Sequence, residues 1–466
     1  MSNIRLAFIL GCWWCLVSCT DKDDTSTVSP DANSISIPDA GVSRLETAQD
    51  LDPLLSQMGA SRYALLGEAS HGTSEFYTWR ATLSKRLIQE KGFTMIAVEG
   101  DWPAIYELNR YVKGTSSATS AKHVMRQFSR WPTWLWANQE VADLAEWLRT
   151  YNLGQPAERK VSFYGLDVYS LWPSLESIRT SFAEADAATL GAVNSALQCL
   201  QSYNRNEEAY AEATLRGVSC ATEINAVLAA VRNQMKTLPA NHEGAFNAEQ
   251  NALVAVNAER YYRSAVLSNA ESWNIRDRHM METINRLMSF HGPAAKIIVW
   301  EHNTHVGDAR YTDMARQGEV NVGQLTREQH ATEGVYVVGT GTYEGTVIAA
   351  PNWGGADAAM RVPAARAGSW EAIMHAKEPR NKLILLQDWR NDPTLTQDRG
   401  HRAIGVVYNP AQEAGNYVPS NLPNRYDAFL FIDQTQALHL LNNTGGRPAA
   451  PAPARPVEQL RQVSNF

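Results

Sequence analysis

A change of hydrophobic period between residues 63 and 80 is the feature that most limits how this chain can fold. A short apolar run is interrupted by glycines, and from Thr73 onward apolar residues recur at the spacing of one helix face. This pattern predicts a buried strand, a loop and a helix that carries Arg80. Glu68 and His71 then lie just beyond the carboxyl end of the strand, where open α/β sheets place their ligands.

Further apolar runs along the chain also end in ionisable residues. Residues 95–98 precede Glu99, residues 161–166 precede Asp167, and residues 296–300 precede Glu301 and His302, with His305 close behind. Parallel, adjacent strands would bring these side chains to one edge of one sheet. The sequence therefore predicts an α/β protein with a central, mostly parallel sheet flanked by helices.

The order of the remaining patterns indicates one sheet with an insertion. Residues 173–291 are almost entirely helical in pattern, and they predict a helical subdomain inserted between the third and fourth strands. Helices are also expected at 103–112 and 134–151, and later strands at 335–339, 383–386, 404–408 and 428–432. We find no internal repeat.

Charge and composition narrow the class of function. The chain has 466 residues, 44% hydrophobic content, 14 Trp and a formal charge of −7, with no stripe of Lys and Arg. This balance argues against nucleic acid as a partner and suits an enzyme that acts on a small molecule. Oligomeric state cannot be predicted from these features.

The start of the chain is typical of an exported protein. An apolar run over residues 6–17 is too short to span a bilayer, which takes ~20 residues, and it ends in a sequence that resembles the bacterial lipobox at Cys19. We predict a lipoprotein signal peptide at 1–18 and a membrane anchor on Cys19, with a plain signal peptide as the alternative. A flexible tether at 19–44, a catalytic domain at 45–444 and a disordered tail at 445–466 follow.

Cysteine usage leaves two possibilities for the mature chain. Removal of the signal peptide leaves Cys199 and Cys220 as the only pair besides the lipidated residue. An oxidising compartment favours a disulfide between two helices, but two buried thiols fit equally well. No cysteine spacing typical of zinc appears.

The residues at the strand ends suit hydrolysis by an activated water. A histidine near its usual pKa of ~6.5 can deprotonate water, and it works better when a carboxylate holds its tautomer. His71 fits this role, with Glu68 or Glu99 as its partner. No Gly-x-Ser-x-Gly elbow is present. Arg80, His302 and His305 would then face the developing oxyanion or the polar groups of the substrate.

Two other functions use the same side chains. The histidines and glutamates supply ligands that suit zinc or iron, which would give a metal-dependent hydrolase. The spacing of His302 and His305, three apart at a strand end, is a poor match to metalloprotease helices. A lipoprotein that binds haem or another large planar ligand is the second alternative.

Several ordered motifs resemble the erythromycin esterase family, over about residues 65–432. They are Leu66-Gly67-Glu68-Ala69-Ser70-His71-Gly72-Thr73, Ala97-Val98-Glu99-Gly100-Asp101-Trp102, Gly165-Leu166-Asp167, Arg276-Asp277, Glu301-His302-Asn303-Thr304-His305 and Gly405-Val406-Val407-Tyr408-Asn409-Pro410. The resemblance implies a metal-independent hydrolase, without cofactor, that opens the lactone of macrolide antibiotics and confers resistance. It also implies that His71 activates water and that Glu68, Arg80, Glu99, His302 and His305 complete the active site.

Residues that would contact the substrate are less sharply indicated. We predict Trp102, Asp167, Arg276 and Asp277 as substrate-binding residues. Trp131, Trp134 and Trp136 are further candidates for an apolar cleft, and Asp427 is a further candidate for orienting Arg80 or the histidines. The helical insertion is the expected wall of that cleft. An exported position suits interception of an antibiotic, and it suits an ester of the cell envelope equally.

Overall fold

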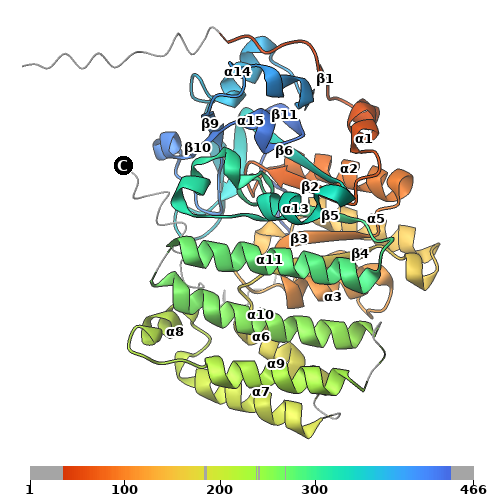
Figure 1. Ribbon diagram of the computed structural model, residues 1–466, viewed down its shortest axis with the longest axis vertical. Coiled ribbons are helices and arrows are strands. Elements are labelled where there is room, and N and C mark those ends of the chain that lie inside the picture. The colour runs from red at the N-terminus through yellow and green to blue at the C-terminus, as the bar shows by residue number, and fades with distance from the viewer. Residues whose placement is uncertain (1–34, 183–185, 238, 240–241, 268, 442–466) are drawn as a thin grey trace, which may run out of the picture.

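A mostly parallel sheet forms the centre of the computed structural model, which describes residues 35–441 apart from 183–185, 238, 240–241 and 268. Within these residues the sheet has nine strands in the order β1-β8-β11-β6-β2-β5-β3-β4, with β7 paired to β6 (Figure 1). The signal peptide, Cys19 and the tail lie outside the described residues. Within the described part, no helix is both long and apolar enough to cross a membrane.

The strands run from β1 to β11 along the chain. Their bounds are β1 Val42–Arg44, β2 Tyr63–Glu68, β3 Met95–Asp101, β4 Ser162–Asp167, β5 Ile297–His302, β6 Val335–Ala349, β7 Ala358–Val362, β8 Lys382–Leu385, β9 Arg399–Arg402, β10 Tyr417–Ser420 and β11 Ala428–Thr435. From β11 to β4 every neighbouring pair is parallel, whereas β1, β7 and β8 pair antiparallel at the periphery. Strands β9 and β10 form a separate hairpin.

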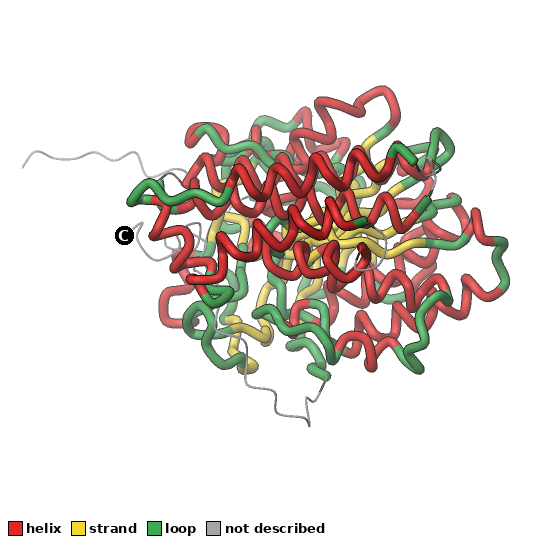
Figure 2. Tube along the Cα trace, turned by 90° about the horizontal axis from the view of Figure 1, so that it is seen from below, coloured by secondary structure: helices red, strands yellow, loops and turns green. Residues whose placement is uncertain are grey.

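Helices cover both faces of the sheet. The bounds are α1 Asp52–Met58, α2 Ser74–Lys91, α3 Trp102–Lys113, α4 Ala121–Met125, α5 Gln139–Leu153, α12 Asn303–Val306, α13 Val322–His330, α14 Trp370–Lys377 and α15 Leu422–Arg425. Successive side chains of a strand point to opposite faces, so Leu66 packs under α2 and α5 while Leu65 packs under α13 and α14. Because both faces are covered, β2 is buried at every residue. Figure 2 shows the strands enclosed by helices.

The segment between β4 and β5 is helical wherever it has regular structure. It holds α6 Leu171–Phe182, α7 Ala187–Leu200, α8 Glu207–Thr214, α9 Ala221–Met235, α10 Glu243–Ala265 and α11 Asn269–His291. Helices α6 to α10 share an apolar core of their own. Within this group α10 also packs against α11, and α11 lies against the sheet (Figure 1). A disulfide joins Cys199 in α7 to Cys220, the residue before α9.

Three sequence predictions are wrong in detail. Residues 404–408 form no strand, because they make only isolated bridges to neighbouring loops. The helix predicted at 134–151 begins at Gln139, since the Asn138 side chain accepts a hydrogen bond from the Val141 amide and caps it there. The tether does not extend to residue 44, because β1 pairs with the exposed edge of β8 and Ile37 is buried.

Candidate active site

The carboxyl ends of β2, β5, β3 and β4 bring together the ionisable residues that the sequence singled out. These strands are adjacent and parallel, as predicted. Glu68, Glu99, Asp167 and His302 are in the last residues of the strands rather than beyond them. Glu68 pairs in register with His302 across β2 and β5. The chain thus concentrates acids and imidazoles at one sheet edge.

Glu68 is the carboxylate that holds His71. The Nδ1 of His71 lies 2.9 Å from Oε1 of Glu68, and both side chains are almost fully buried. An ionised carboxylate only accepts hydrogen bonds, so the proton is on Nδ1 and Nε2 carries the lone pair. His71 also lines a cavity, so a bound molecule would lie next to this pair.

Arg80 fixes the other side of the Glu68 carboxylate. Its Nη2 donates to Oε2 of Glu68, and its guanidinium stacks between the rings of Tyr77 and Trp300, 4.6 Å from each ring centroid. Arg80 is 1% exposed and does not reach the cavity. Its contact with the site in this structure is through Glu68.

The loop that carries His71 is tied down by its backbone. The Ala69 amide donates to Thr340 Oγ1, and the Gly72 carbonyl accepts from the Ile348 amide at 2.9 Å. A Cβ at position 72 would lie 1.9 Å from the Ile348 carbonyl oxygen, so only glycine fits there. Close packing against β6 thus places His71 relative to Glu68.

Glu99 belongs to a second cluster, centred on Arg276 of α11. Arg276 Nη2 donates to Glu99 Oε1 at 2.6 Å, and Arg276 also binds both oxygens of Asp167. The His302 amide donates to the other Glu99 oxygen. Burial alone would raise the pKa of Glu99, but the facing charges of His305 and Arg276 lower it below its usual value. Glu99 is therefore a carboxylate at neutral pH.

His305 forms a second histidine–carboxylate pair on the α11 side. Its Nδ1 lies 3.0 Å from both oxygens of Asp277, and its ring stacks on Trp273. Against the effect of burial, Asp277 and Glu99 raise the pKa of His305 to about 9. His305 is 2% exposed and, like Asp277, does not line the cavity. The structure thus places both residues, which the sequence predicts as catalytic and substrate-binding, next to this cavity's lining residues Glu99 and Arg276 rather than in its wall.

His302 lies between the two clusters. Its ring centroid is 4.8 Å from that of His71, and its Nδ1 contacts Thr304 Oγ1 at 2.8 Å. Burial, helped by the proximity of His71, lowers the pKa of His302 well below its usual value, so the ring is neutral. Its Nε2 is buried and has no hydrogen-bond partner. His302 packs beside the base and is not part of the cavity wall.

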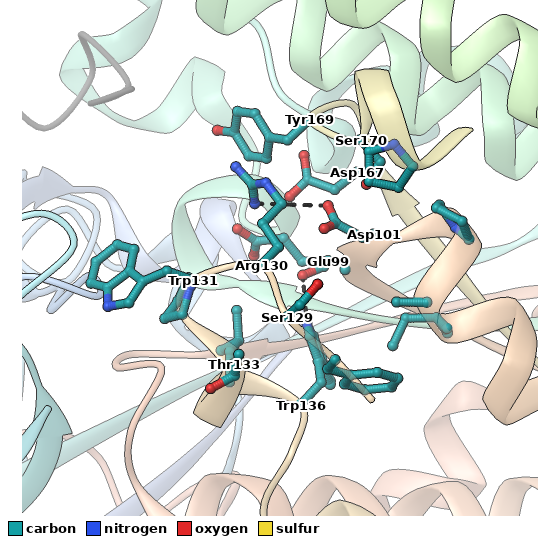
Figure 3. Close-up of a pocket in the computed structure, with 18 of the residues that line it drawn as sticks. Glu99, Asp101, Ser129, Arg130, Trp131, Thr133, Trp136, Asp167, Tyr169 and Ser170 are labelled. Atoms are coloured by element: carbon teal, nitrogen blue, oxygen red, sulfur yellow. Dashed lines mark hydrogen bonds and ion pairs between the residues drawn. The ribbon is translucent and has the colours of Figure 1, made fainter. Parts of the chain in front are cut away.

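The cavity beside His71 has a volume of about 340 Å³, and aromatic, charged and hydroxyl-bearing side chains surround it (Figure 3). Its walls include His71, Glu99, Asp101, Ile105, Phe128, Ser129, Arg130, Trp131, Thr133, Leu135, Trp136, Asp167, Tyr169, Ser170, Arg276, Trp353 and Val406. Such a volume is at the lower end of the range that holds a drug-sized molecule. The cavity therefore accepts part of a large ligand or the whole of a small one.

The predicted substrate-binding residues divide between the cavity and the core. The cavity is lined by Asp167, Arg276, Trp131 and Trp136. Trp102 and Trp134 do not line it. Trp102 is fully buried between Tyr106 and Tyr164 in the core, because the start of α3 turns it under β4. Asp427 binds Arg327, Arg390 and the Val337 amide rather than any catalytic residue. Arg130, Asp101 and Trp353 also line the cavity but were not predicted from the sequence as substrate-binding residues. Of the three, only Asp101 lies in a sequence motif, the one that contains Glu99.

Metal ligands are not assembled in this arrangement. Among residues 35–441, gaps excepted, no three or more His, Cys, Asp or Glu side chains are placed to hold a metal ion. The ring nitrogens of His71 and His305 instead contact carboxylates at hydrogen-bond distance.

Fold and site together define an α/β protein with an enclosed acid–base centre at the carboxyl edge of its sheet. The family model for erythromycin esterase matches residues 88–435. The chain therefore belongs to the erythromycin esterase family. Erythromycin esterase type II of Escherichia coli is 22% identical over 274 residues, which are 55% of this chain and 63% of that protein. The match thus spans less than two thirds of the relative's length.

Solved structures show the same fold at low sequence identity. A protein of Bacillus cereus has a TM-score of 0.72 and 20% identity, with 87% of this chain and 97% of that chain covered. A succinoglycan biosynthesis protein gives a TM-score of 0.69, 20% identity and coverage of 86% and 96%. The erythromycin esterase EreC, solved as a histidine-to-asparagine mutant in its open conformation, has a TM-score of 0.61 and 18% identity. The match covers 84% of this chain and 95% of that chain.

Proposed function

We propose that this protein is a carboxylic ester hydrolase that opens the macrolactone of erythromycin-type antibiotics without a metal or other cofactor. One observation carries the proposal: Glu68 holds the His71 Nδ1 at 2.9 Å while the ring faces the cavity. Family membership supports the same reaction class. His71 is the general base of this mechanism.

The reaction follows from the tautomer of His71. Nε2 takes a proton from water as the water oxygen bonds to the acyl carbon, and Glu68 stabilises the imidazolium that forms. When the tetrahedral intermediate collapses, the ester C–O bond breaks and the imidazolium returns the proton to the leaving alkoxide. Glu99 lines the cavity as a fixed carboxylate and orients the attacking water. Arg80, His302 and His305 are positioning residues that hold Glu68 and Glu99.

Cavity size bears on the choice of substrate. A volume of about 340 Å³ admits the ester-bearing edge of a macrolactone and leaves the rest of the ring outside. The same volume encloses a smaller ester completely, which makes such an ester the second candidate.

Mass spectrometry tests the activity directly. The full chain is incubated with a panel of macrolides, and a gain of one water is expected for at least one, with the His71→Ala variant as the inactive control. No gain across the panel would reject a macrolactone and shift the assignment to the smaller ester. Activity that excess chelator abolishes would contradict metal independence.

We further propose an exported, lipid-anchored protein that confers resistance by destroying the antibiotic before it reaches the ribosome. The lipobox-like sequence that ends at Cys19 supports this location. The Cys19→Ser variant should appear in the soluble fraction of cells, while the parent stays with membranes. Identical fractionation of the two would reject the anchor.

A further inference from the structure

Arg130 is a cavity-wall guanidinium whose hydrogen-bonding groups are not committed within the protein. It stacks over the Tyr169 ring, 4.4 Å from the centroid, and Figure 3 shows it opposite Asp101. The nearest Asp101 oxygen is 3.7 Å from Arg130 Nη1, which is too long for a direct hydrogen bond. The Arg130 Nε is buried and has no partner.

Arg276 is the matched comparison, because it contacts the same Tyr169 ring from the same cavity. Its guanidinium lies 4.9 Å from the ring centroid, yet it donates short hydrogen bonds to Glu99 and Asp167. Arg276 is therefore part of the framework of the site. Arg130, by contrast, has a buried Nε without a partner and only a long ion pair with Asp101, so it can bind a molecule in the cavity.

Asp101 supplies an acceptor beside those donors. Burial and the nearby Asp167 raise the pKa of Asp101, while Arg130 opposes them. Ser170 lines the same wall, and its buried hydroxyl is close enough to Asp101 to help keep the pKa of that carboxyl group down. An oxygen that both accepts and donates, placed between the guanidinium and the carboxyl group, would satisfy each of them.

We propose that Arg130 and Asp101, with Ser170 beside them, form a subsite that binds a hydroxyl group of the substrate, away from the scissile ester. The hydroxyl oxygen accepts from Arg130 and its hydrogen is donated to Asp101. This subsite deepens the proposed hydrolase function and rests on it for the position of the ester.

The charges of the wall decide between a hydroxyl and an anion. Arg130 alone would attract a carboxylate, but Glu99, Asp101 and Asp167 line the same cavity against two arginines. A second anion would approach Asp101 at the cost of like-charge repulsion, whereas a neutral hydroxyl does not. The subsite therefore favours a neutral hydroxyl group of the substrate over an anionic group.

Aromatic side chains elsewhere in the lining of the cavity suit the remainder of such a molecule. Trp131 and Trp353 meet edge to face at 4.5 Å, and the Trp131 Nε1 donates to the Gly355 carbonyl. With Phe128 and Trp136 they form an apolar wall. The site thus selects an ester with one hydroxylated and one hydrocarbon face.

Two variants and two substrates test the subsite. Arg130→Gln is compared with Arg126→Gln, a change at an exposed arginine of the same segment. Each is assayed with erythromycin and with a derivative whose hydroxyls are O-methylated. Arg130→Gln should raise KM for erythromycin at least tenfold with kcat within about threefold, because a site built to bind a hydroxyl loses ground-state binding when a partner is removed. Arg126→Gln should change neither.

The methylated derivative makes the result specific. The parent enzyme should bind it at least tenfold more weakly, and Arg130→Gln should add no further loss, since the same contact is already missing. An equal loss on both substrates would reject the subsite. Should the parent hydrolyse neither compound, the proposed hydrolase activity fails. In that case calorimetry measures binding of both compounds and tests the subsite alone. The subsite is supported if the parent binds erythromycin more tightly than the methylated derivative and Arg130→Gln does not. It is rejected if the parent binds both compounds equally or binds neither.

Discussion

Two histidine–carboxylate pairs lie at the same sheet edge and differ in what surrounds them. Glu68 and His71 meet at 2.9 Å beside the cavity, whereas Asp277 and His305 meet at 3.0 Å behind it. His305 is further enclosed by the stacked ring of Trp273. The chemistry of the two pairs is alike, so the place of His71 at the cavity is our reason for proposing catalysis for that pair and a supporting role for the other.

The largest expected effect separates the two pairs by activity. His71→Ala should lower kcat/KM by ~10²-fold or more, the usual scale for loss of a general base, and leave the fold intact. The ring contributes to the cavity wall rather than to the core, so Tm should change little. Steady-state kinetics and thermal unfolding of the same preparation check both parts. Near-normal turnover would show that the Glu68–His71 pair is not catalytic.

Disruption of the Asp277–His305 pair should instead lower the free energy of unfolding. Asp277 is fully buried and binds His305 and the Val322 amide. Asp277→Ala leaves a buried charge without its partner, a change that costs about 3–5 kcal/mol of unfolding free energy. Denaturant unfolding measures it, with Glu282→Ala on the exposed side of α11 as the control, expected within about 0.5 kcal/mol. Equal costs for the two variants would contradict a structural role for Asp277.

His279, on the same helix, shows what a carboxylate partner does to a buried histidine. Burial lowers the pKa of His279 to about 4, while the carboxylates around His305 raise its pKa to about 9. Only the unfolded state protonates His279 between pH ~6.5 and 4, so the stability that its neutral form provides is complete above pH ~6.5 and falls by up to about 3 kcal/mol on acidification. His305 has the opposite sign: its contribution is complete below pH ~6.5 and is lost as pH rises toward 9.

Unfolding free energies measured across pH 4–9 check this contrast. His279→Gln keeps an acceptor for Asn257, which lies 2.9 Å from the ring, and removes the titrating group. Its stability should depend less on pH in the acid range, with the alkaline range unchanged. An acid slope identical to that of the parent would assign the effect to other residues.

Sequence patterns predicted the parts of this fold that local chemistry determines. Strands β2, β3, β4 and β5 are continuous apolar runs, and they were predicted because full burial requires such a composition. Strands β1 and β7 were missed, since they are short, largely exposed and formed by pairing with β8 and β6. Their existence depends on distant residues, which no local pattern reports.

The same distinction applies within the site. His71 and Glu68 are close in sequence, so their pairing was one of the two predicted alternatives. Choosing between Glu68 and Glu99 requires knowing to which face of the sheet each side chain points. Glu68 follows the face of Leu66, which packs under α2, and Glu99 follows the face of Ala97, which packs toward α11. Arg130 lies on a loop that has no motif, and only the folded chain places it at the cavity.

The smallest expected effect concerns Glu301, which follows Trp300 in β5 and lies on the side of the Asp277–His305 pair. It is fully buried, and neither carboxyl oxygen has a hydrogen-bond partner. Burial, with Glu99 and Asp277 nearby, raises the pKa of Glu301 well above its usual value, so the group is neutral. Glutamine is neutral and almost the same shape, and Glu301→Gln should therefore change stability by less than about 1 kcal/mol.

Glu99→Gln is the comparison that makes this result informative, because Glu99 is ionised and binds Arg276. Loss of that charge should cost more than the change at Glu301, by about 2 kcal/mol or more, since Arg276 and His305 then lose one of the buried carboxylates that balance them. Denaturant unfolding ranks the two variants. Infrared spectroscopy adds a direct readout, because a protonated carboxyl band should be present in the parent and lost in Glu301→Gln. Equal costs for the two glutamines would contradict a neutral Glu301.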